Sequence, residues 1–150
     1  MHESETKDEC LNSSGRRTSF VPDSRIFPPA TAKLAGMKLN GAGFQHLCMS
    51  QFDLSRGDFR AADLRGDCSH VKFCKINSRK ARLSGGQFAH SDFSDSNLTG
   101  AAMEEADMMG CQFVRTVLKR ADLRGTKSDR VAFEDVIWQS AVFDEPTRFS

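Results

Sequence analysis

Cysteine and histidine side chains gather between residues 46 and 90, where they could ligate a metal ion. Thiolate and imidazole groups are the ligands that zinc prefers in proteins. Cys48 and Cys68 are twenty residues apart, but the chain contains no Cys-x-x-Cys or His-x-x-x-His pair. We therefore predict structural or incidental thiols, with no bound metal and no cofactor. The six residues are His46, Cys48, Cys68, His70, Cys74 and His90.

Adjacent carboxylates are a second candidate, because two of them can act as a general acid and a general base. They form the pairs Glu104–Glu105, Glu134–Asp135 and Asp144–Glu145. A catalytic pair needs a cleft that excludes water and shifts the pKa of one member. No nucleophile motif or phosphate-binding loop accompanies these pairs. We predict that the protein is not an enzyme.

A repeat with a period of five, from Leu34 to Phe143, positions these side chains. Each unit has a small residue, a polar residue, a large apolar residue that we call the centre, and two polar or small residues, as in Ala121–Gly125. An α-helix has a period of 3.6 and a strand a period of 2, so neither fits. The pattern predicts a solenoid that turns a corner every five residues and buries every centre. The 22 centres are Leu34, Leu39, Phe44, Met49, Leu54, Phe59, Leu64, Phe73, Ser78, Leu83, Phe88, Phe93, Leu98, Met103, Met108, Phe113, Leu118, Leu123, Ser128, Phe133, Trp138 and Phe143.

The repeat resembles the pentapeptide-repeat family, whose motif is Ala-(Asp/Asn)-Leu-x-x. The resemblance covers Ala32 to about Glu145, and its closest matches are Ala62–Gly66, Ala106–Gly110 and Ala121–Gly125. It implies an all-β fold, a right-handed quadrilateral parallel β-helix with four pentapeptides in each coil. The 22 centres would then form about 5.5 coils, stacked at the ~4.8 Å spacing of hydrogen-bonded strands.

Residues twenty positions apart should stack in such a coil. Phe73, Phe93, Phe113 and Phe133 would form one aromatic column. Only nine residues separate the centres Leu64 and Phe73, where ten are needed. We therefore predict one irregular corner, at Asp67–His70.

Two parts of the surface are candidate partner-binding sites. A basic stripe follows the column of Phe59, Ser78, Leu98 and Leu118 and would meet an acidic partner, most simply a protein. At the last coil, apolar residues occupy outward positions or lie at centres with no complete coil above them, which exposes an open β-helix end. The stripe residues are Arg60, Arg79, Lys80, Lys119 and Arg120, and the C-terminal residues are Val117, Ile137, Trp138, Val142 and Phe143.

The remaining features of the sequence predict the limits of the domain and its surroundings. Residues 1–30 are rich in polar side chains and prolines and are predicted to be a flexible tail, residues 31–145 the β-helix, and residues 146–150 a short C-terminal tail. The five cysteines lack a framework spacing, which favours reduced thiols in a bacterial cytoplasm. No apolar run reaches the roughly 20 residues of a membrane helix, so we predict no membrane partner.

We predict a non-catalytic rigid scaffold that binds another protein, with homodimer formation through the C-terminal coil. The resemblance implies the alternative of a DNA-mimicking regulator or protector of DNA gyrase or topoisomerase. The formal net charge of +1 argues against it, because DNA mimics are strongly acidic. It also argues against direct nucleic-acid binding. A further alternative is a secreted effector or toxin-associated subunit that docks through its N-terminal tail.

Overall fold

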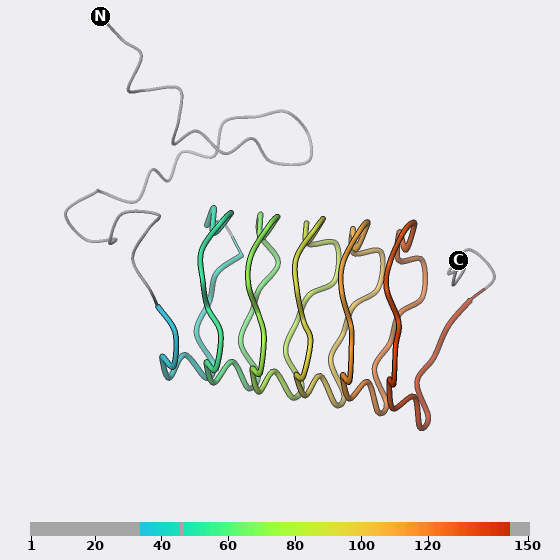
Figure 1. Cartoon of the computed structure of the whole chain (residues 1–150). Helices are drawn as coiled ribbons and strands as arrows, with labels where there is room; N and C mark the ends of the chain where they lie inside the picture. Colours follow the sequence, from blue (N-terminus) through green and yellow to red (C-terminus); the bar gives the residue numbers. More distant parts are fainter. Residues whose placement is uncertain (1–33, 46, 145–150) are drawn as a thin grey trace, which may run out of the picture.

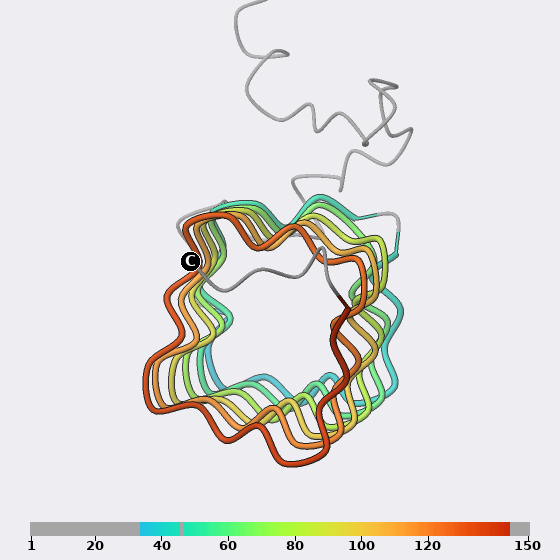
Figure 2. The same cartoon turned by 90° about the vertical axis from the view of Figure 1, so that its right-hand side faces the viewer.

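The computed structural model describes residues 34–45 and 47–144 (Figure 1). Within these ranges the chain winds into a stack of similar coils, and the view along the stack shows a four-sided outline (Figure 2). The described residues contain no helix and no extended strand. Their β structure consists of isolated parallel bridges, from Lys38↔Asp58 to Asp122↔Val142. The predicted parallel four-sided coil is therefore present, whereas its right-handed sense and the number of coils stay predictions.

The register of the bridges defines the length of one coil. Bridged residues are twenty positions apart along most of the chain, as in Gln87↔Asp107, so four pentapeptides complete a coil. The residue in each bridge precedes a centre, and the backbone N–H of the centre itself donates to the next coil. For example, the N–H of Phe93 donates to Gln112 O at 2.8 Å. These hydrogen bonds run along the stack and hold each inward side chain above its counterpart in the previous coil.

The predicted phenylalanine column is confirmed. Phe73 and Phe93 stack with ring centroids 4.8 Å apart, and Phe93 and Phe113 follow at 5.2 Å. Phe133 continues the column at 5.3 Å from Phe113. The first three rings are fully buried, so the core is one side chain wide and each coil is covered by its two neighbours.

The irregular corner is real, but its predicted position was wrong. The bridge Asp63↔Arg82 spans 19 residues, and so does Cys48↔Asp67. The missing residue therefore lies between Leu64 and Cys68, and Cys68 is a fully buried additional centre. The chain bends at Gly66 instead of making a two-residue turn, whereas Ser69–His70 is an ordinary turn.

Gly66 is required at this corner by the close approach of the neighbouring coil. A Cβ atom at position 66 would lie 2.6 Å from Leu47 O and 2.7 Å from Phe44 O. Both distances are far inside van der Waals contact, and both oxygens belong to the backbone. The shortened corner thus exists only because one of its residues lacks a side chain.

Buried hydroxyl groups complete the hydrogen bonding at two later corners. Ser91 Oγ accepts from the N–H of Val71 at 2.9 Å and donates to Cys68 O at 2.6 Å. The hydroxyl is thereby inserted between the two backbone groups of a turn in the preceding coil. Ser96 bridges the N–H of Ile76 and Phe73 O in the same way. Serine at the small position of the repeat therefore pairs backbone groups that water cannot reach.

Replacing Ser78 by alanine should stabilise the protein. Ser78 is a centre between Phe59 and Leu98, it is fully buried, and its Oγ has no hydrogen-bond partner. Because a buried unpaired hydroxyl is costly, we expect Ser78→Ala to raise the free energy of unfolding by about 1 kcal/mol, measured by urea denaturation. The matched control is Ser91→Ala, the same change at a bonded buried hydroxyl, which should lower it by about 1–3 kcal/mol. Destabilisation by both changes to the same extent would contradict this account.

The predictions for the N-terminal tail, the C-terminal tail and His46 lie outside the described residues, and the domain boundaries stay predictions. No helix of the described part of the chain is long and apolar enough to cross a membrane.

Candidate protein-interaction surfaces

The predicted basic stripe lies on one column of the rod. Backbone hydrogen bonds link its corners, because the N–H of Lys80 donates to Thr99 O at 2.9 Å and the N–H of Gly100 donates to Lys119 O at 2.8 Å. Arg79–Lys80 and Lys119–Arg120 are therefore two coils apart on the same corner, with Thr99–Gly100 between them. The structure brings these four basic residues together as predicted.

Arg60 is on the same column but is not an unpaired cation. Its Nη2 lies 2.6 Å from Asp58 Oδ2, and its Nε donates to Asp58 Oδ1 at 2.8 Å. This hydrogen bonding holds the pKa of the Asp58 carboxyl below its ordinary value. The positive charge of Arg60 is thus compensated by Asp58, so Arg60 differs from the other members of the predicted stripe.

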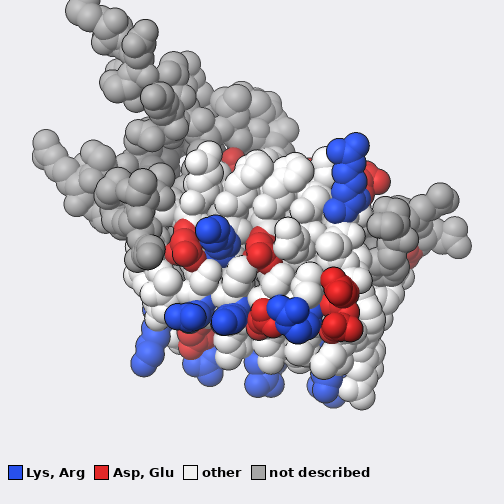
Figure 3. Space-filling model, in the orientation of Figure 1, with Lys and Arg blue, Asp and Glu red and all other residues white. Residues whose placement is uncertain are grey.

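We call Arg79, Lys80, Lys119 and Arg120 the basic patch. No ion pair joins any of them to a carboxylate among the residues that the structure describes, whereas Arg115 pairs with Asp95 at 2.7 Å. Elsewhere on the rod, basic and acidic side chains are interspersed, as Figure 3 shows for one face. The basic patch is therefore a local excess of positive charge on a nearly neutral protein.

The C-terminal coil exposes apolar side chains. Val117 bridges to Ile137, which confirms that they stack on one face. Ile137 is 48% exposed, and Val142 is 45% exposed. Trp138 is half-buried and meets Phe143 edge to face with ring centroids 5.2 Å apart. We call Val117, Ile137, Trp138, Val142 and Phe143 the C-terminal apolar strip.

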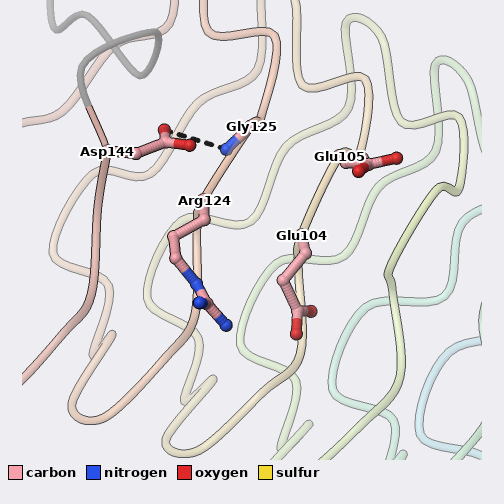
Figure 4. Close-up of a pocket in the computed structure, with 5 residues that line it drawn as sticks. All are labelled: Glu104, Glu105, Arg124, Gly125 and Asp144. Atoms are coloured by element: carbon pink, nitrogen blue, oxygen red, sulfur yellow. Dashed lines mark hydrogen bonds between the residues drawn. The ribbon is translucent and has the colours of Figure 1, made fainter.

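One carboxylate pair lies at a shallow depression of about 360 Å³ lined by Glu104, Glu105, Arg124, Gly125 and Asp144 (Figure 4). Asp144 Oδ1 accepts from the N–H of Gly125 at 2.9 Å, and Glu104 Oε2 accepts from the hydroxyl of Ser84. Arg124 pairs with Asp122 and holds the pKa of that carboxyl below its ordinary value. These side chains lie at an open part of the surface, and the hydroxyl of Ser84 is bonded to one of the carboxylates. Glu134 and Asp135 are exposed at another corner, and Glu145 lies outside the described residues.

The cysteines and histidines do not assemble into a metal-binding cluster within the described ranges, where no three His, Cys, Asp or Glu side chains converge. His70 and His90 stack at one corner with ring centroids 5.0 Å apart. Cys68 faces the core, and burial raises the pKa of its thiol, as it raises that of Cys111 to about 12. These thiols are poor metal ligands, because a metal binds the thiolate.

Cys68, Cys74 and Cys111 are free thiols, and burial raises the pKa of Cys74 to about 11. Cys48 is disulfide-bonded, so the expectation of reduced thiols throughout the chain is wrong at that position. Because Cys68 is free, Cys48 and Cys68 are not joined to each other.

Residues 67–100 and 91–127 match a family model described as pentapeptide repeats, with eight copies. Residues 67–127 are pentapeptide repeats. Among solved structures, the rod is similar to HetL, a pentapeptide repeat protein involved in heterocyst differentiation regulation from the cyanobacterium Nostoc sp. strain PCC 7120. The two share 20% sequence identity with a TM-score of 0.52, over 77% of this chain and 60% of HetL. That likeness supports the fold, and this chain covers less than two thirds of HetL.

Two further solved structures are less similar, the first of them a pentapeptide repeat protein. One comes from the thylakoid lumen of Arabidopsis thaliana, with 21% identity and a TM-score of 0.45 over 69% of each chain. The other is QnrB1, a plasmid-mediated fluoroquinolone resistance protein, with 14% identity and a TM-score of 0.37 over 73% of this chain and 61% of QnrB1. No curated protein sequence matches this one.

The pentapeptide period shows one arrangement that our reading of the sequence missed. Ser84, Glu104, Arg124 and Asp144 each follow a centre of the same column and recur every twenty residues. The spacing alone could have placed them in a row along the rod. Their individual partners could not be read from it, because Arg124 pairs within its own repeat and Glu104 bonds to the preceding coil.

Proposed function

We propose that this pentapeptide-repeat protein is a non-catalytic, rigid interaction module. The observation that carries the proposal is the exposure of the C-terminal apolar strip, in which Ile137 and Val142 stay about half exposed beside centres of the last described coil. Large apolar side chains grouped on a surface are typical of protein interfaces. The rod presents them on a backbone that hydrogen bonds hold in one geometry, so little conformational entropy is lost on binding.

We assign the two surfaces to two kinds of contact. The C-terminal apolar strip would bury against another protein, in the simplest case a second copy of this chain. The basic patch, with Arg60 at its margin, would meet an acidic protein surface. Unpaired cations at exposed positions mainly raise the rate and the specificity of association, whereas buried apolar contacts supply most of the affinity.

The substitution Ile137→Asp tests the first contact. If the strip joins two copies, wild-type protein sediments as a dimer, and the variant should dissociate at the same concentration because a buried unpaired carboxylate opposes association. Sedimentation velocity measures the difference. Met109→Asp, at an exposed apolar position on another column, is the control and should leave sedimentation unchanged. A monomer for both wild type and Ile137→Asp would end the homodimer proposal.

An assay of gyrase supercoiling distinguishes the proposed scaffold from a regulator of DNA gyrase. A DNA mimic needs a continuous acidic surface, and the basic patch supports an acidic partner instead. On this proposal, added protein leaves gyrase supercoiling unchanged, and inhibition or protection of the enzyme would favour the alternative. A pull-down that compares the full-length protein with a variant lacking residues 1–30 tests docking through the N-terminal tail. Only a protein that docks through this tail should lose its partner when the tail is removed.

A further inference from the structure

One face of the rod carries cations and amide groups over three successive coils but no carboxylate. The bridges Asn77↔Asn97 and Asn97↔Val117 place these residues in one row, and the basic patch lies at the corner that follows the row. In the coil before them the row residue is Asp58, which pairs with Arg60 at 2.6 Å. The positive charge therefore follows from asparagine or valine, in place of aspartate, at the row positions. We call this surface the donor face, and it consists of Asn77, Arg79, Lys80, Asn97, Thr99, Gly100, Val117, Lys119 and Arg120.

The amide oxygens of the two asparagines are already engaged. Asn77 Oδ1 accepts from the N–H of Arg79 at 3.4 Å. Asn97 Oδ1 accepts from the N–H of Thr99 at 3.0 Å and from its hydroxyl at 2.6 Å. No described residue accepts from the amide nitrogen of either asparagine. Both side chains therefore still offer donors, which suits a ligand rich in acceptors, such as carboxylates.

The cations of the donor face cover a length of two coils. Arg79–Lys80 and Lys119–Arg120 lie two coil spacings apart, which is roughly 10 Å. The corner between them has only the small residues Thr99 and Gly100. Lys80 Cγ lies 3.6 Å from the position that a Cβ atom of Gly100 would take, so the stem of Lys80 extends over the middle coil. A ligand with two acidic groups about 10 Å apart would therefore meet one cation pair with each group.

Apolar side chains continue the donor face toward the C-terminal end of the rod. Val117 belongs to the row, and Ile137, which is 48% exposed, stacks on it one coil further along. A ligand that meets Lys119 and Arg120 thus reaches apolar surface directly beside them. A peptide can supply an apolar side chain next to its carboxylates, whereas a nucleic acid repeats its charge at every phosphate. The composition of this surface therefore favours a protein segment as the ligand.

We propose that the donor face binds an extended segment of a partner protein, lying along the rod, in which two acidic residues three positions apart are followed by an apolar residue. In the polyproline II conformation, residues three positions apart point to the same side and lie about 9 Å apart, which matches two coil spacings. The two carboxylates meet the two cation pairs and the asparagine amides, and the apolar side chain reaches Ile137. This inference rests on the proposed role of the basic patch as a binding surface, and it narrows the acidic partner to one class of segment.

Two peptides of the same composition test the spacing. Acetyl-Glu-Pro-Pro-Glu-Leu-amide has the proposed spacing, and acetyl-Pro-Pro-Glu-Glu-Leu-amide places its carboxylates next to each other. Titrated into ¹⁵N-labelled full-length protein, the first peptide should shift the amide resonances of Thr99, Gly100 and Arg120. It should bind about threefold more tightly than the second, because it meets both cation pairs at once. Binding should weaken at an ionic strength of about 0.5 M, where the screening length is roughly 4 Å. Equal affinities, or no shift at millimolar concentrations of the first peptide, would overturn the inference and leave the proposal of an acidic partner in place.

Substitutions on the rod test the cations. Arg79→Gln/Arg120→Gln removes one cation from each pair and should weaken binding of the first peptide by about threefold or more. The matched control is Arg56→Gln/Arg130→Gln, which removes two exposed arginines from other columns and should leave the affinity unchanged. Equal weakening by the two double variants would overturn the basic patch as a binding surface, and with it the proposed function of the patch.

The apolar contact and the class of ligand have their own readouts. Replacing the leucine of the first peptide by glycine should weaken its binding to wild-type protein but not to Ile137→Ser, since the contact is already lost in that variant. An equal loss against both proteins would overturn the contact with Ile137. A thymidine trinucleotide carries the same charge as the peptide on its two phosphates, and tighter binding of the trinucleotide would overturn the choice of a protein partner.

Discussion

Replacing Phe93 by alanine should lower the free energy of unfolding by about 3–5 kcal/mol, the largest loss expected from a single substitution in this chain. Phe93 is fully buried and stacks on Phe73 at 4.8 Å and on Phe113 at 5.2 Å. Truncation leaves a cavity in a core that is one side chain wide, and it removes contacts with both neighbouring coils. Urea denaturation followed by circular dichroism measures the effect.

The matched control is Phe143→Ala, the same change at the end of the rod. Phe143 is 36% exposed, and no described coil lies above it. In a solenoid, stability is roughly a sum of contacts between neighbouring repeats, so a terminal centre contributes less than an internal one. Equal losses for Phe93→Ala and Phe143→Ala would show that the column is not the source of stability.

The substitution Gly66→Ala should destabilise the shortened corner by about 1–3 kcal/mol or more, because the added methyl group meets two backbone oxygens that cannot move independently. The predicted Cβ contacts are 2.6 Å to Leu47 O and 2.7 Å to Phe44 O. The coil on the other side is also affected, since the N–H of Gln87 donates to Gly66 O at 3.0 Å. Hydrogen exchange should therefore lose protection at Gln87 first, alongside a lower midpoint in urea.

Gly43→Ala is the control for this change. A Cβ atom at position 43 meets Gln45 Oε1 at 2.7 Å, but that atom is the end of a flexible side chain that can rotate away. We expect a change within about 0.5 kcal/mol of wild type. If both glycine substitutions are equally tolerated, the close approach of the coils does not explain the corner.

The surfaces proposed for binding were only partly predictable from the sequence. The twenty-residue spacing correctly grouped Arg79, Lys80, Lys119 and Arg120, and it stacked Val117 on Ile137. It also assigned Arg60 to the stripe as a further cation, although Arg60 is paired with Asp58. Column position follows from the period of the repeat, whereas the direction of a long side chain depends on the partner within its reach.

The position of the irregular corner shows the same division. Counting centres correctly located one missing residue between Leu64 and Phe73, but it could not choose among the corners in that interval. Cys68 is a small residue that the apolar pattern did not mark as a centre, and its complete burial became evident only in the stacked coils. The shortened corner lies at Gly66. A Cβ atom at this position would lie within 3 Å of two backbone oxygens, and glycine has no such atom.

The sequence by itself determined the period of five, the inward centres and the phenylalanine column, because each depends only on which residues recur at a regular interval. The tertiary structure decided where the corner is shortened and which hydroxyl groups bridge two coils. Those features depend on atoms nineteen to twenty-three residues apart that meet only when one coil lies on the next. Distances across the stack, which no local pattern encodes, therefore determine which apolar side chains of this protein are available to a partner.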